Sequence, residues 1–318
     1  MSIISRRPKP RLLPELDDQE LGKAVRLLVR LPTPNMIDIQ VGAIAAVVDA
    51  ADAQRDWDRK AHRLAILGSV VAGGQLPEQW LRRQPNDGEA LLFKAWVDVV
   101  RGRLSGSISD AAAIAKSCHR VAADNPEDPT PWVLLVALYR LLRRPLPEMA
   151  GVWSEVVERD PWNRYAYMEM LDYLSPEECG SHLEWMEFIE TVRARTPPDA
   201  PTAGLELTAV VRRYVKLVQG GGVQALLSRS AWAQPWETGA LERAFRLCLS
   251  PGFLQQASAL ADLNTLAYAL VEAERFSEAT VVFQALEGVV TSWPWSTSGD
   301  AVQRYTKAAE RARRRQAA

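Results

Sequence analysis

The chain has 318 residues, of which 47% are hydrophobic and 24% are charged, and its formal net charge is −1. This length suits one or two domains, and the composition excludes wholesale disorder, collagen-like repeats and a polytopic membrane protein. Tryptophan is the unusual residue, with 11 copies against 7 tyrosines and 6 phenylalanines.

The charge is concentrated at the two ends. Residues 1–12 carry +4 and residues 304–318 carry +5, so the 291 residues between them carry −10. Because an acidic body repels phosphates, we expect no nucleic-acid partner. Prolines at positions 8, 10 and 14 alternate with cations, which predicts a disordered basic arm over residues 1–14.

From residue 15 onward the sequence has helical periodicity. An apolar stripe from Leu21 to Leu31 predicts a first helix, with the Asp17-Asp18 carboxylates at its positive end and a proline after it. Further helices are predicted over residues 36–54 and 57–71, the latter ending before two glycines. Strand and hairpin signals are nearly absent, so the predicted fold class is all-α.

The cysteines argue for a reducing compartment. Cys118, Cys179 and Cys248 are an odd number without close pairs, which is not a disulfide framework. Arg6-Arg7 is followed by prolines and acidic residues where an export signal would have an apolar segment. Charges interrupt every apolar stretch, so we expect no membrane association and a cytoplasmic location.

Four segments share one pattern, in which a helix end, a proline and an acidic or Asn-containing turn lead into another helix. The prolines that mark them are Pro85, Pro126, Pro161 and Pro197. Their spacings of 41, 35 and 36 residues indicate paired-helix repeats.

These segments resemble the tetratricopeptide family. The best-matched unit covers residues 260–294, with degenerate units at about 80–200. The residues that carry the match are Leu263, Leu266, Ala267, Leu270, Ala279, Phe283 and Leu286. The segment 101–109 departs from the pattern as an insertion between two helices. The resemblance implies an α-solenoid of stacked helical hairpins.

The predicted organisation has four parts. A disordered arm over 1–14 precedes an N-terminal helical cap over 15–75. A solenoid covers 76–297, and a basic C-terminal helix or tail covers 298–318. A Pro-rich stretch at 196–204 and the glycines at 220–222 are interpreted as inter-repeat loops, with a two-domain split near residue 200 as the alternative.

No motif predicts a metal site, a cofactor or a catalytic residue. Cys118-His119 and Cys179 with His182 could supply a zinc-like set, but adjacent residues on a helix point about 100° apart. A terpene-cyclase-like enzyme is the alternative considered for the Asp17–Glu20 cluster and the Arg304-Tyr305 pair. No phosphate-binding glycine loop or nucleophile motif is present.

The central aromatic residues are interpreted mainly as helix packing, with a groove or ligand pocket as the alternative. We therefore predict a non-catalytic scaffold that binds a protein or peptide on the concave face of the solenoid. The family's pattern positions imply five residues on this face, with the first two as anchors: Arg140, Tyr165, Asp172, Asn264 and Tyr268. The alternative function is an α-helical enzyme that uses a Trp-rich central cavity.

Overall fold

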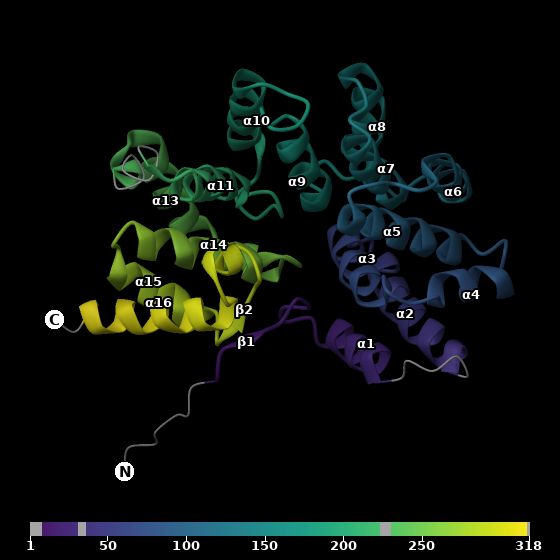
Figure 1. Cartoon of the computed structure of the whole chain (residues 1–318), viewed down its shortest axis with the longest axis horizontal. Coiled ribbons are helices and arrows are strands. Elements are labelled where there is room, and N and C mark those ends of the chain that lie inside the picture. Colours follow the sequence, from purple (N-terminus) through teal and green to yellow (C-terminus); the bar gives the residue numbers. More distant parts are fainter. Residues whose placement is uncertain (1–7, 31–35, 223–229, 317–318) are drawn as a thin grey trace, which may run out of the picture. The chain divides into compact units, whose positions relative to one another are not determined.

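The computed structural model describes residues 8–30, 36–222 and 230–316, and this part of the chain is almost entirely helical (Figure 1). It contains fifteen α-helices, three short 3-10 helices and two strands of two residues each. The all-α prediction is confirmed. Among the described residues, no helix has both the length and the apolar character needed to cross a membrane.

The chain divides into two compact units. The central unit spans Asp18–Glu190, and the split unit joins the chain before Asp18 to the chain from Thr191 onward. The predicted cap over 15–75 is not separate, because its helices from residue 18 onward share one apolar core with the helices that follow. The unit boundary lies a few residues before the Pro-rich stretch at 196–204.

The central unit is a succession of helices, most of which pack on the next helix along the chain. They are α1 (Gln19–Arg30), α2 (Ile37–Asp52), α3 (Trp57–Val71), α4 (Leu76–Arg83), α5 (Gly88–Ser105), α6 (Ala111–Asp124), α7 (Thr130–Leu141), α8 (Leu146–Arg159), α9 (Arg164–Tyr173) and α10 (His182–Arg195), the last of which runs across the unit boundary.

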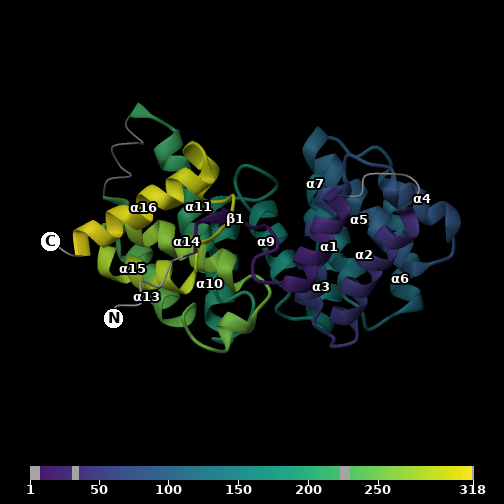
Figure 2. The same ribbon diagram turned by 90° about the horizontal axis from the view of Figure 1, so that it is seen from below.

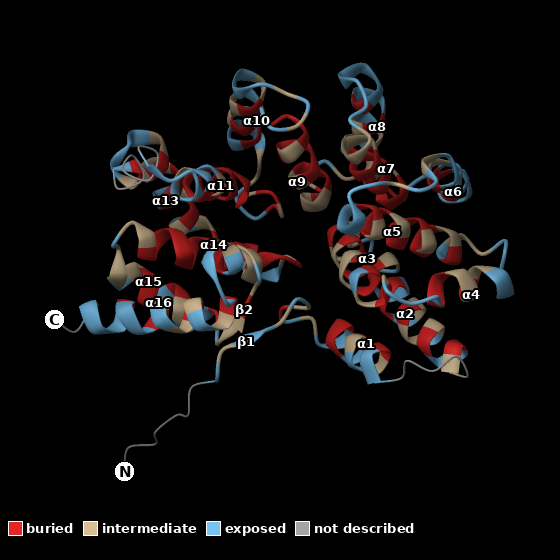
Figure 3. Ribbon diagram, in the orientation of Figure 1, coloured by how far each residue is buried: buried red, intermediate tan, exposed pale blue. Residues whose placement is uncertain are grey.

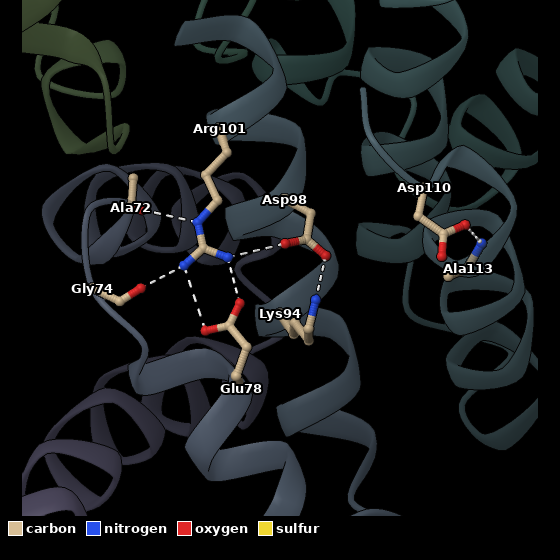
Figure 4. Close-up of polar contacts among 8 residues, drawn as sticks. All are labelled: Ala72, Gly74, Glu78, Lys94, Asp98, Arg101, Asp110 and Ala113. Carbon is tan, nitrogen blue, oxygen red and sulfur yellow. Dashed lines mark hydrogen bonds and ion pairs between the residues drawn. The ribbon is translucent and has the colours of Figure 1, made fainter. Parts of the chain in front are cut away.

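Short polar side chains set where several of these helices begin. Backbone N–H groups of the first turns donate to Asp18, Asp56, Asp110 and Asn163 at 3.0–3.1 Å. Such caps satisfy N–H groups that have no partner within the helix. The cap of α6, from Ala113 to Asp110, is drawn in Figure 4.

The predicted insertion at 101–109 is wrong in part, because α5 continues through Ser105. The helix then ends at Gly106, whose φ of 77° is a conformation that glycine adopts without a Cβ penalty. Apolar residues at 97, 99 and 100 keep the last turns of α5 in the core.

Arg101 holds α5 against the turn between α3 and α4 (Figure 4). Its guanidinium donates to the carbonyls of Ala72 at 2.9 Å and Gly74 at 2.6 Å, and it pairs with Glu78 of α4. This clamp fixes α4 and α5 relative to one another.

The interior of the central unit is a single apolar cluster. Buried residues of both units are red in Figure 3. Trp96 and Phe93 of α5 are its largest fully buried side chains. Burial of apolar area on this scale is the main stabilising contribution to such a unit.

The split unit has its own core. Its elements are α11 (Leu205–Gln219), α13 (Pro235–Leu247), α14 (Ala259–Glu272), α15 (Phe276–Ala285) and α16 (Ala301–Gln316), with 3-10 turns at Ala231–Ala233, Phe253–Gln255 and Trp295–Ser298. Helices α14 and α15 pack together as the best-matched segment predicts, and Ala267 and Ala279 are fully buried. The predicted C-terminal helix is present as α16.

The predicted disorder of residues 1–14 is wrong for residues 8–14, whereas residues 1–7 lie outside the described residues. Strand β1 (Arg11–Leu12), which is labelled in Figure 2, runs parallel to β2 (Val289–Val290) in the split unit, and both strands are labelled in Figure 1. The N–H groups of Arg11 and Leu13 donate to the carbonyls of Gly288 and Val290 at 2.9 and 3.0 Å. The prolines keep this segment extended, and an extended segment can pair with an exposed edge.

Candidate functional site

A pocket of about 270 Å³ lies within the central unit, where five helices meet. It is formed by α2, α3, α4, α5 and α6 with the turn that follows α6, and we call it the α2–α6 pocket. Its volume is close to the lower end of the roughly 300–1,000 Å³ typical of small-ligand sites.

The floor of the α2–α6 pocket is apolar. It is lined by Ile44, Val48, Leu64, Trp80, Leu92, Phe93 and Val121. The indole N–H of Trp80 already donates to Gln84 at 2.9 Å, and the Trp80 ring lies 5.7 Å from that of Phe93. The floor therefore offers a ligand apolar contact.

The rim of the pocket is strongly acidic. Its carboxylates are Asp52, Asp87, Glu89, Asp124 and Asp128, and Lys60 is the cation among the lining residues. They stand at helix ends because the repeated turns between helices are where this sequence places its acidic residues.

Lys60 is buried and paired on both sides. Its Nζ lies 2.8 Å from Asp128 and also contacts Asp52 at the end of α2. Burial alone would lower the pKa of the Lys60 ammonium, but the charges and hydrogen bonds of Asp128 and Asp52 outweigh it and raise the pKa. Lys60 is therefore a permanent cation in the pocket wall.

Glu89 differs from the other rim carboxyls. Partial burial, a hydrogen bond with Asp49 and the charges of Asp49 and Asp87 raise the pKa of Glu89 to about 8. Two carboxyls that approach one another retain a proton because both cannot be charged at low cost. At neutral pH the Glu89 carboxyl, with its raised pKa, therefore keeps its proton.

Three predicted partner-binding residues come together elsewhere in the central unit. Arg140 of α7 pairs with Asp172 of α9 at 2.9 Å and with Glu169 at 2.9 Å. Arg103 links Glu169 at 2.7 Å to the hydroxyl of Tyr165 at 3.2 Å. The predicted anchors are thus engaged within the unit itself, since Arg140 also pairs with Glu178.

The exposed positions predicted for Asn264 and Tyr268 are wrong. Both residues lie in the split unit and are buried, at 0% and 4% exposure. Asn264 donates to the carbonyls of Leu260 and Val289, and it accepts the indole N–H of Trp295 at 2.8 Å. Its polar groups are satisfied by the fold because the segment after α15 covers α14.

The residues considered from sequence for a metal site or a cyclase site are next placed in the structure. Cys118 is buried, which raises the pKa of its thiol to about 12, whereas Cys179 is exposed. No group of three or more His, Cys, Asp or Glu within the described ranges could hold a metal ion. Asp18 caps α1 and pairs with Arg63 at 2.7 Å, and Tyr305 packs against Phe283 and Trp295.

The prediction of a Trp-rich cavity does not describe the α2–α6 pocket. Trp80 is its one tryptophan among the described lining residues. The central aromatics pack on one another, as Trp153 does on Tyr167 with ring centres 4.8 Å apart.

Sequence analysis did not identify the acidic rim. The acidic residues that form it are visible in the repeated turns Pro85–Glu89 and Asp124–Asp128, but the sequence pattern alone marks these turns only as connections between helices. Packing of the helices brings these two turns to one cavity, so their acidic residues converge on one site.

Comparison of the chain with protein-family models, curated proteins and solved structures finds no match. A hypothesis about function therefore rests on the chemistry of the α2–α6 pocket.

Proposed function

We propose that the protein is a non-catalytic scaffold that binds a protein or peptide partner carrying basic side chains, and that the α2–α6 pocket anchors one of them. The observation that carries this proposal is an apolar cavity whose rim has five carboxylates and one lysine. Apolar walls with a few convergent polar groups are the usual form of a binding site, and the excess negative charge favours a cationic group.

The charge of the whole central unit supports the same partner. Residues 18–190 contain 19 Lys and Arg against 26 Asp and Glu, a net charge of −7. A field of one sign accelerates encounter with a partner of the opposite sign and weakens as salt is added.

The proposal includes the finer architecture that the sequence predicts. We place the helical hairpins in a tetratricopeptide-like solenoid, and the partner on its concave face. Packing of α7 on α8 and of α14 on α15 supports hairpins as the building unit. We place the protein in the cytoplasm, where its three cysteines, none of which forms a disulfide in the structure, stay reduced.

An α-helical enzyme is the second candidate, and the carboxyl pair of Asp49 and Glu89 is the observation that favours it. A carboxyl that keeps its proton at neutral pH can act as a general acid. No nucleophile among the lining residues stands with these carboxyls, so the binding function is the better supported of the two.

The test uses a fluorescent peptide of lysine, arginine, leucine and glycine, measured by anisotropy at low salt. We compare the wild type with a pocket variant that carries Asp87→Asn, Glu89→Gln and Asp124→Asn. Asparagine at 87 keeps the helix cap, so this variant should remain folded. We expect the pocket variant to bind at least tenfold more weakly.

A matched control removes three carboxylates away from the pocket, with Glu20→Gln, Glu158→Gln and Glu187→Gln. All three residues are exposed in the central unit. Binding that falls equally in both variants, or equal binding of a peptide with glutamate in place of lysine and arginine, would contradict the proposal.

A further inference from the structure

The α2–α6 pocket already accommodates one primary ammonium group, that of Lys60. The two acidic contacts of its Nζ come from different elements, Asp52 at the end of α2 and Asp128 in the turn after α6. Each carboxylate makes a single-point contact with the ammonium. Such an arrangement suits a compact charge, which can be approached from several directions.

Two arginines of this protein show a different geometry with one of their carboxylate partners. Arg140 places Nε and Nη2 on the two oxygens of Glu178 at 2.8 and 2.6 Å, and Arg243 does the same with Glu206 at 2.9 and 2.6 Å. Both are two-point contacts with one carboxylate, the geometry in which arginine is favoured. The pocket therefore resembles the Lys60 arrangement more than the arginine sites.

Negative charge remains in the pocket after Lys60 is paired. No lysine or arginine of the described ranges forms an ion pair with Asp87, Glu89 or Asp124. Asp87 does accept the N–H of Glu89 as the cap of α5, at 3.0 Å. Asp87 and Asp124, joined by Glu89 once the pH exceeds its raised pKa of about 8, are the acceptors for a second cation.

The helix ends around the pocket add to this preference. Helices α2 and α6 point their C-termini at it, where partial negative charge favours a cation. The N-terminus of α5 has the opposite sign, but the Asp87 cap stands on it. Together, these helix ends and the Asp87 cap therefore contribute a negative electrostatic potential at the pocket.

The apolar floor adds a requirement for the rest of the ligand. Leu92, Phe93 and Val121 line the same pocket as the acidic residues, so a cation bound there lies beside apolar side chains. A linear aliphatic stem satisfies both demands, because lysine buries its methylene groups and keeps its charged end among polar groups.

From these features we infer that the α2–α6 pocket selects a primary ammonium group on a linear aliphatic stem, supplied by a lysine side chain of the partner. This inference rests on the proposed function and narrows it from basic side chains in general to lysine. The commitment to a protein partner follows from the position of the rim at the turns of the central unit, where Glu89 and Asp124 are exposed.

The experiment measures competition against the fluorescent peptide by short capped peptides that differ at one central position. Lysine, arginine and norleucine occupy that position in turn, and 1,5-diaminopentane is tested as a free ammonium compound. We expect the lysine peptide to compete at least fivefold better than the arginine peptide and at least twentyfold better than the norleucine peptide.

The wild type and the two triple variants are all measured. The preference for lysine should disappear in the pocket variant and persist in the matched control. A second variant, Val121→Phe, fills the floor without changing the charge, and it should weaken the lysine peptide at least fivefold. Unchanged unfolding midpoints show that each variant is folded.

The outcomes separate the two proposals. Equal competition by lysine and arginine overturns the ammonium preference and leaves the proposed function standing. Tighter binding of 1,5-diaminopentane than of the lysine peptide overturns the assignment to a partner's side chain. Failure of every cation, the fluorescent peptide included, overturns the proposed function and the inference with it.

Discussion

The central and split units are both built from packed helices, but they use their polar side chains in opposite ways. In the central unit, carboxylates gather at helix ends around an apolar cavity and exceed the cations available there. In the split unit, Asn264 lies inside the core with bonded partners on each side. Acidic groups that exceed the cations around them can bind a ligand, whereas buried polar groups whose hydrogen bonds are all satisfied within the protein stabilise the fold.

The two helices that carry predicted groove residues make this contrast concrete. Tyr165 and Asp172 of α9 are half-buried, whereas Asn264 and Tyr268 of α14 are buried. The difference arises because β2 and Trp295 contact α14, and Tyr268 packs on Trp295 with ring centres 5.4 Å apart. Whether a residue at a given repeat position is exposed therefore depends on which other elements pack on its helix.

The largest expected effect tests the structural role of Asn264. Asn264→Leu would leave the buried indole N–H of Trp295 and the N–H of Thr291 without their acceptor. We expect the free energy of unfolding to fall by about 3–5 kcal/mol, because one buried and one partly buried donor are orphaned and the bonds to Leu260 and Val289 are lost. Urea unfolding measures this. A loss near zero would mean that Asn264 is not the link between α14 and the segment after α15.

The next effect tests a buried carboxyl of the central unit. Asp58 of α3 accepts the N–H of Arg164 at 2.9 Å, and its Oδ2 has no hydrogen-bond partner in the part of the chain that the structure describes. Burial, together with the charges of Asp160 and Asp56, raises the pKa of Asp58 to about 7. The native state therefore keeps the Asp58 proton in a pH range where the unfolded chain has lost it.

Because the folded pKa is raised, the stability that Asp58 contributes is full below pH 4 and is lost as pH rises through 7. Asp58→Asn removes this dependence. We expect the stability of the variant relative to wild type to increase by about 2–4 kcal/mol between pH 4 and pH 8.5, measured by urea unfolding. Glu158→Gln, an exposed change, serves as control, and a pH-independent difference for Asp58→Asn would contradict the assignment.

The smallest effect concerns the rim proton. Raising the pH through about 8, the raised pKa of Glu89, converts Glu89 to a carboxylate, while the raised pKa of Lys60 keeps its ammonium charged. Lysine in a peptide remains charged at pH 9. We expect the lysine peptide to bind about two- to fivefold more tightly at pH 9 than at pH 6.5, because an exposed charge pair contributes up to about 1 kcal/mol.

Glu89→Gln should remove this pH dependence and leave the affinity at pH 6.5 nearly unchanged, since Glu89 is already neutral there. Weaker binding of the wild type at pH 9 would show that another group controls the pocket.

Local features of the fold were predictable from sequence. The helices expected over 36–54 and 57–71 correspond to α2 and α3, because apolar period and end signals are properties of a short stretch of chain. The extension of α5 through Ser105 was missed because glycines and serines there look like a loop, whereas burial of the helix decides the matter.

The site was less predictable because it depends on contacts distant in sequence. Each rim carboxylate is visible in a turn, but only tertiary packing brings Asp52, Glu89 and Asp124 around one cavity. The sequence likewise contains Arg140 without showing that Glu169, Asp172 and Glu178 already pair with it.

The pairing of β1 with β2 has a consequence for the order in which the protein folds during synthesis. Residues 18–190 complete one unit with their own contacts, so they can fold while the rest of the chain is still being translated. The split unit, in contrast, joins residues 11–13 to residues 288–290, so that closure waits until β2 has left the ribosome. Strand β1 is thus synthesised well before the strand with which it pairs.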